Sequence, residues 1–474
     1  MKYQDRPLVQ ALQNFHDRKP VSFHVPGHKG GVLSNLPVTV RQALAYDLTE
    51  LTGLDDLHEP SAAIKEAEDK LACLYGSERS FFLVNGSTVG NLAMLYATVR
   101  PGDLVMVQRN AHKSIFNALE LTGANPVFLS PDWDELTQTA GTVSLKTVKE
   151  ALTQYPNVKA AVFTTPTYYG ILNKDLEQII EVCHSFSIPV LVDEAHGAHF
   201  IVHDAFPTSA LELGADLVVQ SAHKTLPAMT MASFLHIHSQ FVKVERVAHY
   251  LQMLQSSSPS YLLMASLDDA RYYAETYDEK DYESFQLYRR NLIQDLCNLA
   301  GVEVVETDDQ LKLLIRATGH TGFVLQKALE MRGIYPELAD LYQVLLVLPL
   351  VKVRDEKRCV DVVDKFKVAM DCLAEKKTTS VRLHNYLSKS SPSSVVYTAS
   401  QLHTMDMGWV NMQSATGRVA ADAIIPYPPG IPLLCAGERI SHEHMEQIQD
   451  LLMAGCRFQG AINRETKQIK VVVE

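Results

Sequence analysis

From about residue 80 to 240 the chain alternates short apolar runs with longer stretches of helical character. The runs SFFLV, DLVMVQ, AAVFTT, IPVLVDEA and ADLVVQ are rich in β-branched and other apolar residues, which is typical of buried strands. Stretches such as NGSTVGNLAMLYATV and LEQIIEVCHSF, with apolar residues at helical spacing, lie between them. This alternation predicts an α/β fold with a mostly parallel sheet covered on both faces.

A cluster of polar residues follows each of the five predicted strands. In chain order these clusters read NGST, RNAHKS, TTPTYYG, DEAHGAH and SAHKT. The carboxyl ends of parallel strands lie at one edge of a sheet, and open α/β sheets bind ligands beyond that edge. The five clusters therefore predict one binding site, built from segments that are far apart in the sequence.

The segments on either side of this region have a different character. Residues 1–60 contain the turn-rich polar stretches FHVPGHKGG and DLTELTGLDDLHEP, which indicate an N-terminal arm. Residues 61–290 form the predicted large domain, which carries the five strands. Residues 291–474 mix strand-like and helical stretches and include the sequence YPPGIP, whose prolines and glycine require an irregular loop. They are predicted to form a smaller α+β C-terminal domain.

Composition and charge exclude several classes of protein. A net charge of −12 with no basic block argues against a nucleic-acid or anionic-membrane binding protein. The seven cysteines are scattered and form no C-x-x-C pair, which favours free thiols in a reducing compartment. The most apolar run, YQVLLVLPLVKV, is too short to cross a bilayer and is predicted to be a buried strand. No signal peptide is recognisable, so a cytoplasmic location is predicted.

Two motifs suggest other functions, and each lacks a necessary part. DEAH at residues 193–196 suggests a nucleotide-driven motor, but the chain has no G-x-x-x-x-G-K-[ST] phosphate loop. His24 and His28 have the spacing of metal ligands on a helix, but the VPG between them prevents that helix. We therefore predict neither a motor nor a metal site.

Three of the strand-end clusters together supply the parts of a pyridoxal phosphate site. In NGST, Gly86 permits a close backbone approach, and Ser87 and Thr88 lie where a helix N-terminus would attract a phosphate. Asp193 ends an apolar strand, where an unpaired carboxylate would be costly, and Lys224 follows the next strand. A lysine can form a Schiff base with the cofactor, and an aspartate can keep its pyridine nitrogen protonated.

The motifs also resemble one known family, the ornithine/lysine/arginine decarboxylases, which are pyridoxal-phosphate-dependent enzymes of the aspartate-aminotransferase fold (fold type I). The resemblance runs over nearly the whole chain and rests on FHVPGHKGG, GLDDLHEP, FFLVNGSTVGN, RNAHKS, TTPTYYG, VDEAHGAHF, SAHKTL, SSSPSYLLMASLD and YPPGIPLL. Longer family members carry an additional N-terminal wing domain. The chain starts at the arm and so resembles the short, wingless members.

The resemblance implies a role for particular residues. Lys224 would form the Schiff base, Asp193 would pair with the ring nitrogen, and His112 would stack on the ring, which makes these three the predicted catalytic residues. Ser257 or Ser258 would reach the phosphate of a neighbouring subunit, because family sites are shared across a homodimer; a higher oligomer is left open. The predicted cofactor-binding residues are Ser87, Thr88, His112, Asp193, Ala195, His196, Ser221, His223, Lys224, Ser257 and Ser258.

The resemblance also bears on the substrate. In GIYPELAD, Glu337 corresponds to the family's substrate-clamping element and is the candidate for binding the distal cation of a basic amino acid; the alternative is an exposed loop carboxylate. Arginine is ranked first as the substrate, then lysine and ornithine. Relatives often have LTQ where this chain has MTM at 229–231, which puts the fine placement of the substrate in doubt.

The implied reaction is α-decarboxylation, which yields carbon dioxide and an amine of polyamine biosynthesis. Two alternatives remain open. One is another enzyme of the same fold, such as an aminotransferase or a different lyase. The other is a non-catalytic relative that binds the cofactor and serves as a scaffold.

Overall fold

The computed structural model describes residues 3–358, 362–374, 392–427, 431–453 and 456–473 of the 474-residue chain. Residues 428–430 of the predicted YPPGIP loop lie outside the described residues. The chain divides into two compact units. Unit 1 consists of Met1–Thr98 and Pro189–Asp278, and unit 2 of Val99–Ile188 and Glu279–Glu474.

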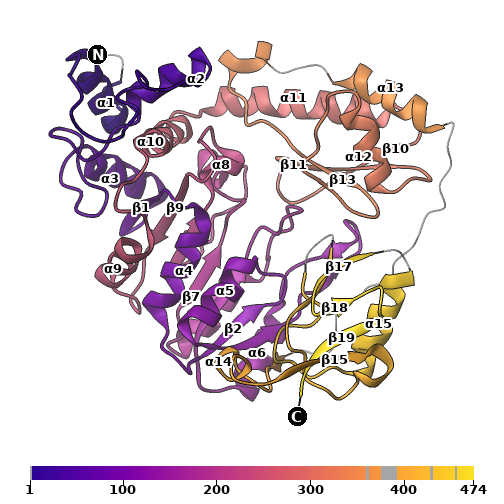
Figure 1. Cartoon of the computed structure of the whole chain (residues 1–474). Helices are drawn as coiled ribbons and strands as arrows, with labels where there is room; N and C mark the ends of the chain where they lie inside the picture. Colours follow the sequence, from indigo (N-terminus) through magenta and orange to yellow (C-terminus); the bar gives the residue numbers. More distant parts are fainter. Residues whose placement is uncertain (1–2, 359–361, 375–391, 428–430, 454–455, 474) are drawn as a thin grey trace. The chain divides into compact units, whose positions relative to one another are not determined.

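Unit 1 contains four neighbouring strands in the order β1-β9-β8-β7. β7 and β8 are parallel, and β9 is antiparallel to its neighbours β8 and β1, so β1, β7 and β8 run in one direction. Helix α4 packs against β1, β8 and β9, and α9 lies against α4 (Figure 1). The strands are β1 (Arg79–Leu83), β7 (Val190–Asp193), β8 (Leu217–Gln220) and β9 (Ser233–Ile237), and the helices are α1 (Pro7–Asp17), α2 (Val38–Ala43), η1 (Leu44–Tyr46), α3 (Ala63–Tyr75), α4 (Gly86–Thr98), η2 (Phe200–Val202), α8 (Ala222–Thr225), α9 (Val244–Leu254) and α10 (Tyr261–Glu275).

The core of unit 1 lies in this sheet and under α4. Every residue of β7, β8 and β9 is buried, which explains why these strands are nearly continuous apolar runs in the sequence. Gly86 has a φ of +76°, a conformation that L side chains rarely adopt, and it turns the chain from β1 into α4. The sequence therefore places the start of α4 directly beyond a strand end.

Unit 2 contains a second run of four strands, in the order β6-β2-β3-β14. β2 is parallel to both β3 and β6, and the short β14 is antiparallel to β3. The elements of this part are β2 (Leu104–Gln108), α5 (Lys113–Thr122), β3 (Asn125–Leu129), β4 (Trp133–Asp134), β5 (Thr139–Ala140), α6 (Leu145–Gln154), β6 (Val158–Thr164), α7 (Leu176–Ser185) and β14 (Ser393–Ser394).

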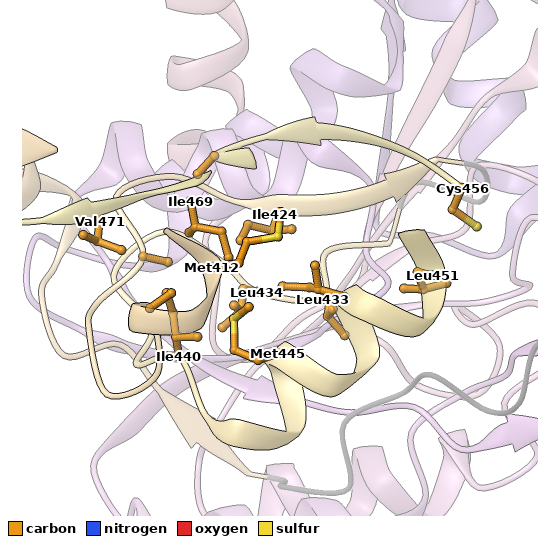
Figure 2. Packing of buried hydrophobic residues seen from close by; sticks show 14 residues of the cluster. Met412, Ile424, Leu433, Leu434, Ile440, Met445, Leu451, Cys456, Ile469 and Val471 are labelled. Carbon is orange, nitrogen blue, oxygen red and sulfur yellow. The ribbon is translucent and has the colours of Figure 1, made fainter. Parts of the chain in front are cut away.

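The rest of unit 2 has smaller antiparallel sheets, in the orders β10-β11-β13-β12, β15-β19-β18 and β16-β17. Helix α15 closes a core of apolar side chains that includes Leu434, Ile440 and Ile469 (Figure 2). The elements are α11 (Glu279–Cys297), β10 (Val302–Glu306), β11 (Lys312–Ala317), α12 (Gly322–Glu330), β12 (Leu338–Ala339), β13 (Val344–Val347), η3 (Val353–Arg358), α13 (Val363–Ala374), α14 (Ala399–Leu402), β15 (Met407–Asn411), η4 (Met412–Ser414), β16 (Ile424–Tyr427), α15 (His442–Met453), β17 (Arg457–Gly460), β18 (Ile462–Asn463) and β19 (Gln468–Val472).

The strands expected from the hydrophobic pattern are present. The five apolar runs form β1, β2, β6, β7 and β8, and the run YQVLLVLPLVKV contains β13. The polar clusters NGST, DEAHGAH and SAHKT begin at the carboxyl ends of β1, β7 and β8, which lie at one edge because these strands run in the same direction. Within the described part of the chain, no helix is both long and apolar enough to cross a membrane.

Candidate active site

Asp193 is the last residue of β7, and its carboxylate is buried, with 2% exposure. Asn91 of α4 donates from Nδ2 to Oδ2 at 2.9 Å, and the backbone N–H of Ala195 donates to Oδ1 at 3.2 Å. A buried carboxylate is costly unless it is hydrogen-bonded, and these two donors offset part of that cost. Asn91 was not predicted as a site residue, although it ends the same NGSTVGN motif that supplies Ser87.

Lys224 lies in the short helix α8, four residues beyond the end of β8. Its Nζ is 3.1 Å from Nε2 of the buried His196. As an ammonium, Lys224 donates in this contact; as a neutral amine it can also accept from the ring. The parallel pairing of Asp193 with Val219 brings the ends of β7 and β8 together, so Lys224, His196 and Asp193 meet at one edge of the sheet.

Ser221 connects this edge to the start of α4. It is fully buried, and its hydroxyl donates to Oγ of Ser87 at 3.0 Å. Ser87 is the second residue of α4, and Thr88 follows it in an exposed position. The first turn of a helix presents unpaired backbone N–H groups and partial positive charge. Hydroxyls and amides therefore gather where a phosphate would bind.

His223 lies beside Lys224 and is held by the backbone. Its Nδ1 is 3.0 Å from the carbonyl oxygen of Ala232, so Nδ1 carries a proton. Burial lowers the pKa of His223, and the neighbouring Lys224 lowers it further, although the bond to Ala232 acts in the opposite direction. The ring is therefore biased toward its neutral form.

The segment with Ser257 and Ser258 lies next to the α4 start. Ser256 donates from its backbone N–H to Oδ1 of Asn85 at 3.3 Å, and Asn85 directly precedes Gly86. Ser257 and Ser258 are both exposed. The structure thus places this segment beside the start of α4, with its two serines facing solvent.

His112 belongs to unit 2, where it caps α5. Its Nδ1 accepts from the backbone N–H of Ser114 at 3.3 Å and lies 2.8 Å from the Ser114 hydroxyl. Three residues earlier, the buried Arg109 makes a bidentate ion pair with Glu438, with N–O distances of 2.8 and 2.7 Å. This pair ties the start of the RNAHKS segment to the C-terminal part of the chain, and Ser114 holds the His112 ring.

Glu337 also belongs to unit 2 and is exposed. It accepts a hydrogen bond from the hydroxyl of Tyr168, in the TTPTYYG segment after β6. The next residue, Tyr169, donates to the buried Asp340 at 2.8 Å, and the buried Lys312 donates from Nζ to the carbonyl oxygen of Tyr168 at 2.9 Å. The two tyrosines were not predicted as site residues, although Tyr168 bonds directly to Glu337.

The residues of unit 1 fit a pyridoxal phosphate group. A half-buried amine, a buried and hydrogen-bonded carboxylate, and a helix N-terminus with serine hydroxyls are connected by hydrogen bonds or lie within a few residues of one another. These are the groups that the cofactor's aldehyde, ring nitrogen and phosphate require.

Two family models match the chain. The model described as "Orn/Lys/Arg decarboxylase, major domain" matches residues 6–308, and "Orn/Lys/Arg decarboxylase, C-terminal domain" matches residues 370–462. Among individual proteins, "Uncharacterized protein YaaO" of Bacillus subtilis (strain 168) is 47% identical over 480 residues, covering 99% of this chain and 98% of that protein. "Arginine decarboxylase" of the same organism is 34% identical over 496 residues, covering 100% of this chain and 99% of that protein.

Solved structures show the same fold. The lysine decarboxylase LdcF of Francisella novicida aligns with a TM-score of 0.77 at 22% identity, covering 99% of this chain and 81% of that one. The constitutive lysine decarboxylase of E. coli aligns with a TM-score of 0.76 at 19% identity, covering 99% and 82%. These likenesses confirm the predicted fold class, a large α/β part with a mostly parallel sheet and a smaller C-terminal α+β part.

Proposed function

The chain belongs to the Orn/Lys/Arg decarboxylase family, and we propose that it removes the α-carboxylate of arginine, with lysine and ornithine as weaker candidates. It is a pyridoxal-phosphate-dependent amino-acid decarboxylase. The observation that carries the residue assignment is the meeting of Lys224, Asp193 and the α4 start at one edge of the unit 1 sheet. The products are carbon dioxide and an amine of the polyamine pathway.

The bound cofactor supplies an electron sink for the charge left when the carboxylate departs. The chain's own residues prepare that site. Lys224 presents its amine 3.1 Å from Nε2 of His196. Asp193 provides the negative charge that holds a proton on the ring nitrogen, and Asn91 and the Ala195 N–H fix the direction of its two oxygens.

The same proposal assigns the phosphate to Ser87, Thr88, Ser221 and His223, and the face of the ring to His112. Ala195 and His196 line the pocket. The hydroxyl-to-hydroxyl bond between Ser221 and Ser87 supports the phosphate assignment, because both groups can turn toward an anion that takes its place.

Arginine is ranked first for two reasons. Several relatives that match nearly the full chain at 33–34% identity are named arginine decarboxylases. A guanidinium also binds a carboxylate through two parallel hydrogen bonds, whereas an ammonium acts as a point charge. Tyr168 donates to Oε1 of Glu337 and so holds the carboxylate in one orientation.

The test is incubation of the purified holoenzyme with arginine, lysine and ornithine, followed by measurement of amine and carbon dioxide. We expect a yellow protein that releases agmatine faster than cadaverine or putrescine, and a colourless, inactive Lys224→Ala variant. Keto-acid products would identify an aminotransferase instead. A coloured protein that turns over none of the three amino acids would identify a cofactor-binding scaffold.

We also propose a homodimer as the working unit, with Ser257 or Ser258 reaching the phosphate of the neighbouring subunit. Several large apolar side chains of the N-terminal segment are unusually exposed in the single chain, including Phe23 at 93% and Val32 at 80%, and such surface is typical of an interface. A cytoplasmic location is proposed because none of the described cysteines forms a disulfide. Sedimentation at several concentrations tests the dimer; a monomer with full activity would contradict it.

A further inference from the structure

Glu194, which directly follows Asp193 at the end of β7, is a second buried carboxylate of unit 1. Successive residues at a strand end point to opposite faces of the sheet, so Asp193 bonds to α4 while Glu194 turns the other way. Oε1 of Glu194 accepts from the backbone N–H of Ala210 at 2.7 Å, and Oε2 accepts from the Ser209 hydroxyl at 2.8 Å. Oε2 also accepts from Nε2 of Gln220 at 2.6 Å. The cofactor chemistry described above does not use this carboxylate.

The bond between Glu194 and Gln220 joins two strand ends. Glu194 directly follows Asp193 at the end of β7, and Gln220 directly precedes Ser221 at the end of β8. The two residues that contact each other are therefore the immediate neighbours of two cofactor residues. A change in this contact that the two side chains do not absorb moves Asp193 relative to Ser221 and Lys224.

The connection continues across the sheet through buried side chains. Oε1 of Gln220 is 3.2 Å from Nε2 of His236 in β9, and Nδ1 of His236 is 2.7 Å from the hydroxyl of Ser80 in β1. The Ser80 hydroxyl is in turn 2.7 Å from that of Ser77. This chain of hydrogen bonds therefore joins β7, β8, β9 and β1, and it reaches β1 at Ser80, the second residue of that strand.

The hydrogen bonds along this chain all run in one direction. Nε2 of Gln220 donates to Glu194, so its Oε1 must accept from His236, which therefore carries its proton on Nε2. Nδ1 of His236 must then accept from Ser80, and Ser80 accepts from Ser77. Burial lowers the pKa of His236 to about 3, so the ring is neutral and has only one proton to place.

We propose that Glu194 is a positioning residue, which through Gln220 holds the carboxyl ends of β7 and β8 in the register that the cofactor contacts require, and which is anchored through His236 to Ser80 of β1. The relay acts on Asp193 and Ser221 through the backbone and touches neither cofactor nor substrate. Its direction is set by the acceptor at Glu194, because every later member follows from the orientation of the Gln220 amide.

Glu194→Gln tests the direction of the relay. The new side chain must keep its oxygen toward the Ala210 N–H, which places its NH2 group toward Gln220. Gln220 then has to turn its oxygen toward residue 194 and its NH2 toward His236, and the His236 proton has to move from Nε2 to Nδ1. The imidazole ¹⁵N shifts of the holoenzyme at pH 8 report this tautomer, and we expect them to exchange between wild type and variant, with cofactor affinity retained.

Gln220→Leu tests the register. It removes both hydrogen bonds at similar volume, and we expect the dissociation constant of pyridoxal phosphate to rise roughly tenfold or more, the equivalent of about 1.4 kcal/mol. Asp216→Asn is the matched control. Asp216 is also buried and also joins the two strands, accepting from the Val190 N–H at 2.7 Å, but it lies at their amino ends. This variant should lower the melting temperature and leave cofactor affinity within roughly twofold.

Two results would overturn the proposal. One is an identical His236 tautomer in wild type and Glu194→Gln. The other is an equal effect of Gln220→Leu and Asp216→Asn on cofactor affinity, which would show that the relay contributes only general stability. If Gln220→Leu fails to fold, the tautomer measurement still decides, because in Glu194→Gln the bonds from residue 194 through Gln220 and His236 to Ser80 can all form in the reversed direction, and only the Ser209 hydroxyl loses its acceptor.

Discussion

Gly90→Ala is expected to destabilise the protein and to weaken cofactor binding, although helix propensity alone predicts a more stable helix. In the middle of a helix, alanine is favoured over glycine by about 1 kcal/mol. At position 90 of α4, however, an added Cβ would lie 2.7 Å from Cγ2 of Val219 and 2.8 Å from Cδ1 of Leu83. Carbon atoms rest about 3.5–4.0 Å apart, so α4 would have to move from β8 by on the order of 1 Å.

The steric effect should outweigh the propensity gain. Overpacking a well-filled core costs about 1–3 kcal/mol, so the expected net loss in unfolding free energy is up to about 2 kcal/mol. The same displacement carries Ser87 away from Ser221, now 3.0 Å apart. Cofactor affinity should therefore fall as well, since both residues are proposed to hold the phosphate. Denaturant unfolding of the apoprotein and cofactor titration measure the two effects separately.

A second substitution identifies the cause. Val219→Ala removes the two methyl groups that would lie 2.7 and 3.1 Å from the new Cβ. Val219→Ala is itself destabilising because Val219 is buried, but the double variant should lose less stability than the sum of the two single losses, which gives a favourable coupling in a double-mutant cycle. Strictly additive effects of the two substitutions, or a Gly90→Ala variant as stable as wild type with unchanged cofactor affinity, would refute the reasoning.

Three further predictions concern other parts of the molecule. Tyr168→Phe removes the hydroxyl that orients Glu337, so KM for the preferred amino acid should rise severalfold while the cofactor spectrum stays unchanged. In a Glu337→Gln background, steady-state kinetics should show no further rise in KM. Burial raises the pKa of Glu194 from 4.5 to about 7. The contribution of Glu194 to the unfolding free energy is therefore complete below pH 4.5 and is lost as the pH rises through 7, a change on the order of 3 kcal/mol. Unfolding curves of Glu194→Gln should lack this change. Arg109→Lys cannot reproduce the bidentate pair with Glu438, and should lower the unfolding free energy by about 2–4 kcal/mol in denaturant titration; an unchanged midpoint would contradict it.

Much of the unit 1 site follows from local sequence pattern. Short apolar runs determine where β7 and β8 end, and parallel strands bring their ends to one edge, so Asp193 and Lys224 were predicted together from their positions after the strands. The start of α4 was predictable for the same reason, since Gly86 and Ser87 follow β1 directly. The boundaries proposed at residues 60 and 290 stay predictions, as do the roles of Lys224, Asp193, His112, Glu337 and the other site residues.

The polar contacts inside the sheet could not be predicted, because they depend on how strands pair. Gln220 meets His236 only because β9 is antiparallel to β8, with Val218 opposite His236. If β9 were parallel to β8, His236 would lie opposite a different residue of β8. Asn91 was missed for a related reason: its contact with Asp193 requires α4 to lie closely on β8, which the close approach at Gly90 allows.

The two carboxylates assigned to the reaction differ in environment, and this difference has consequences for specificity. Asp193 is buried, where its charge acts on a bound ring with little screening by water. Glu337 is exposed, and an exposed ion pair contributes about 1 kcal/mol or less. Such a pair cannot by itself discriminate strongly between a guanidinium and an ammonium. The buried Asp340 and Lys312 already hold the adjoining tyrosines in place. Strong selection for arginine therefore requires only that the bound substrate, or a second copy of the chain, shields Glu337 from water.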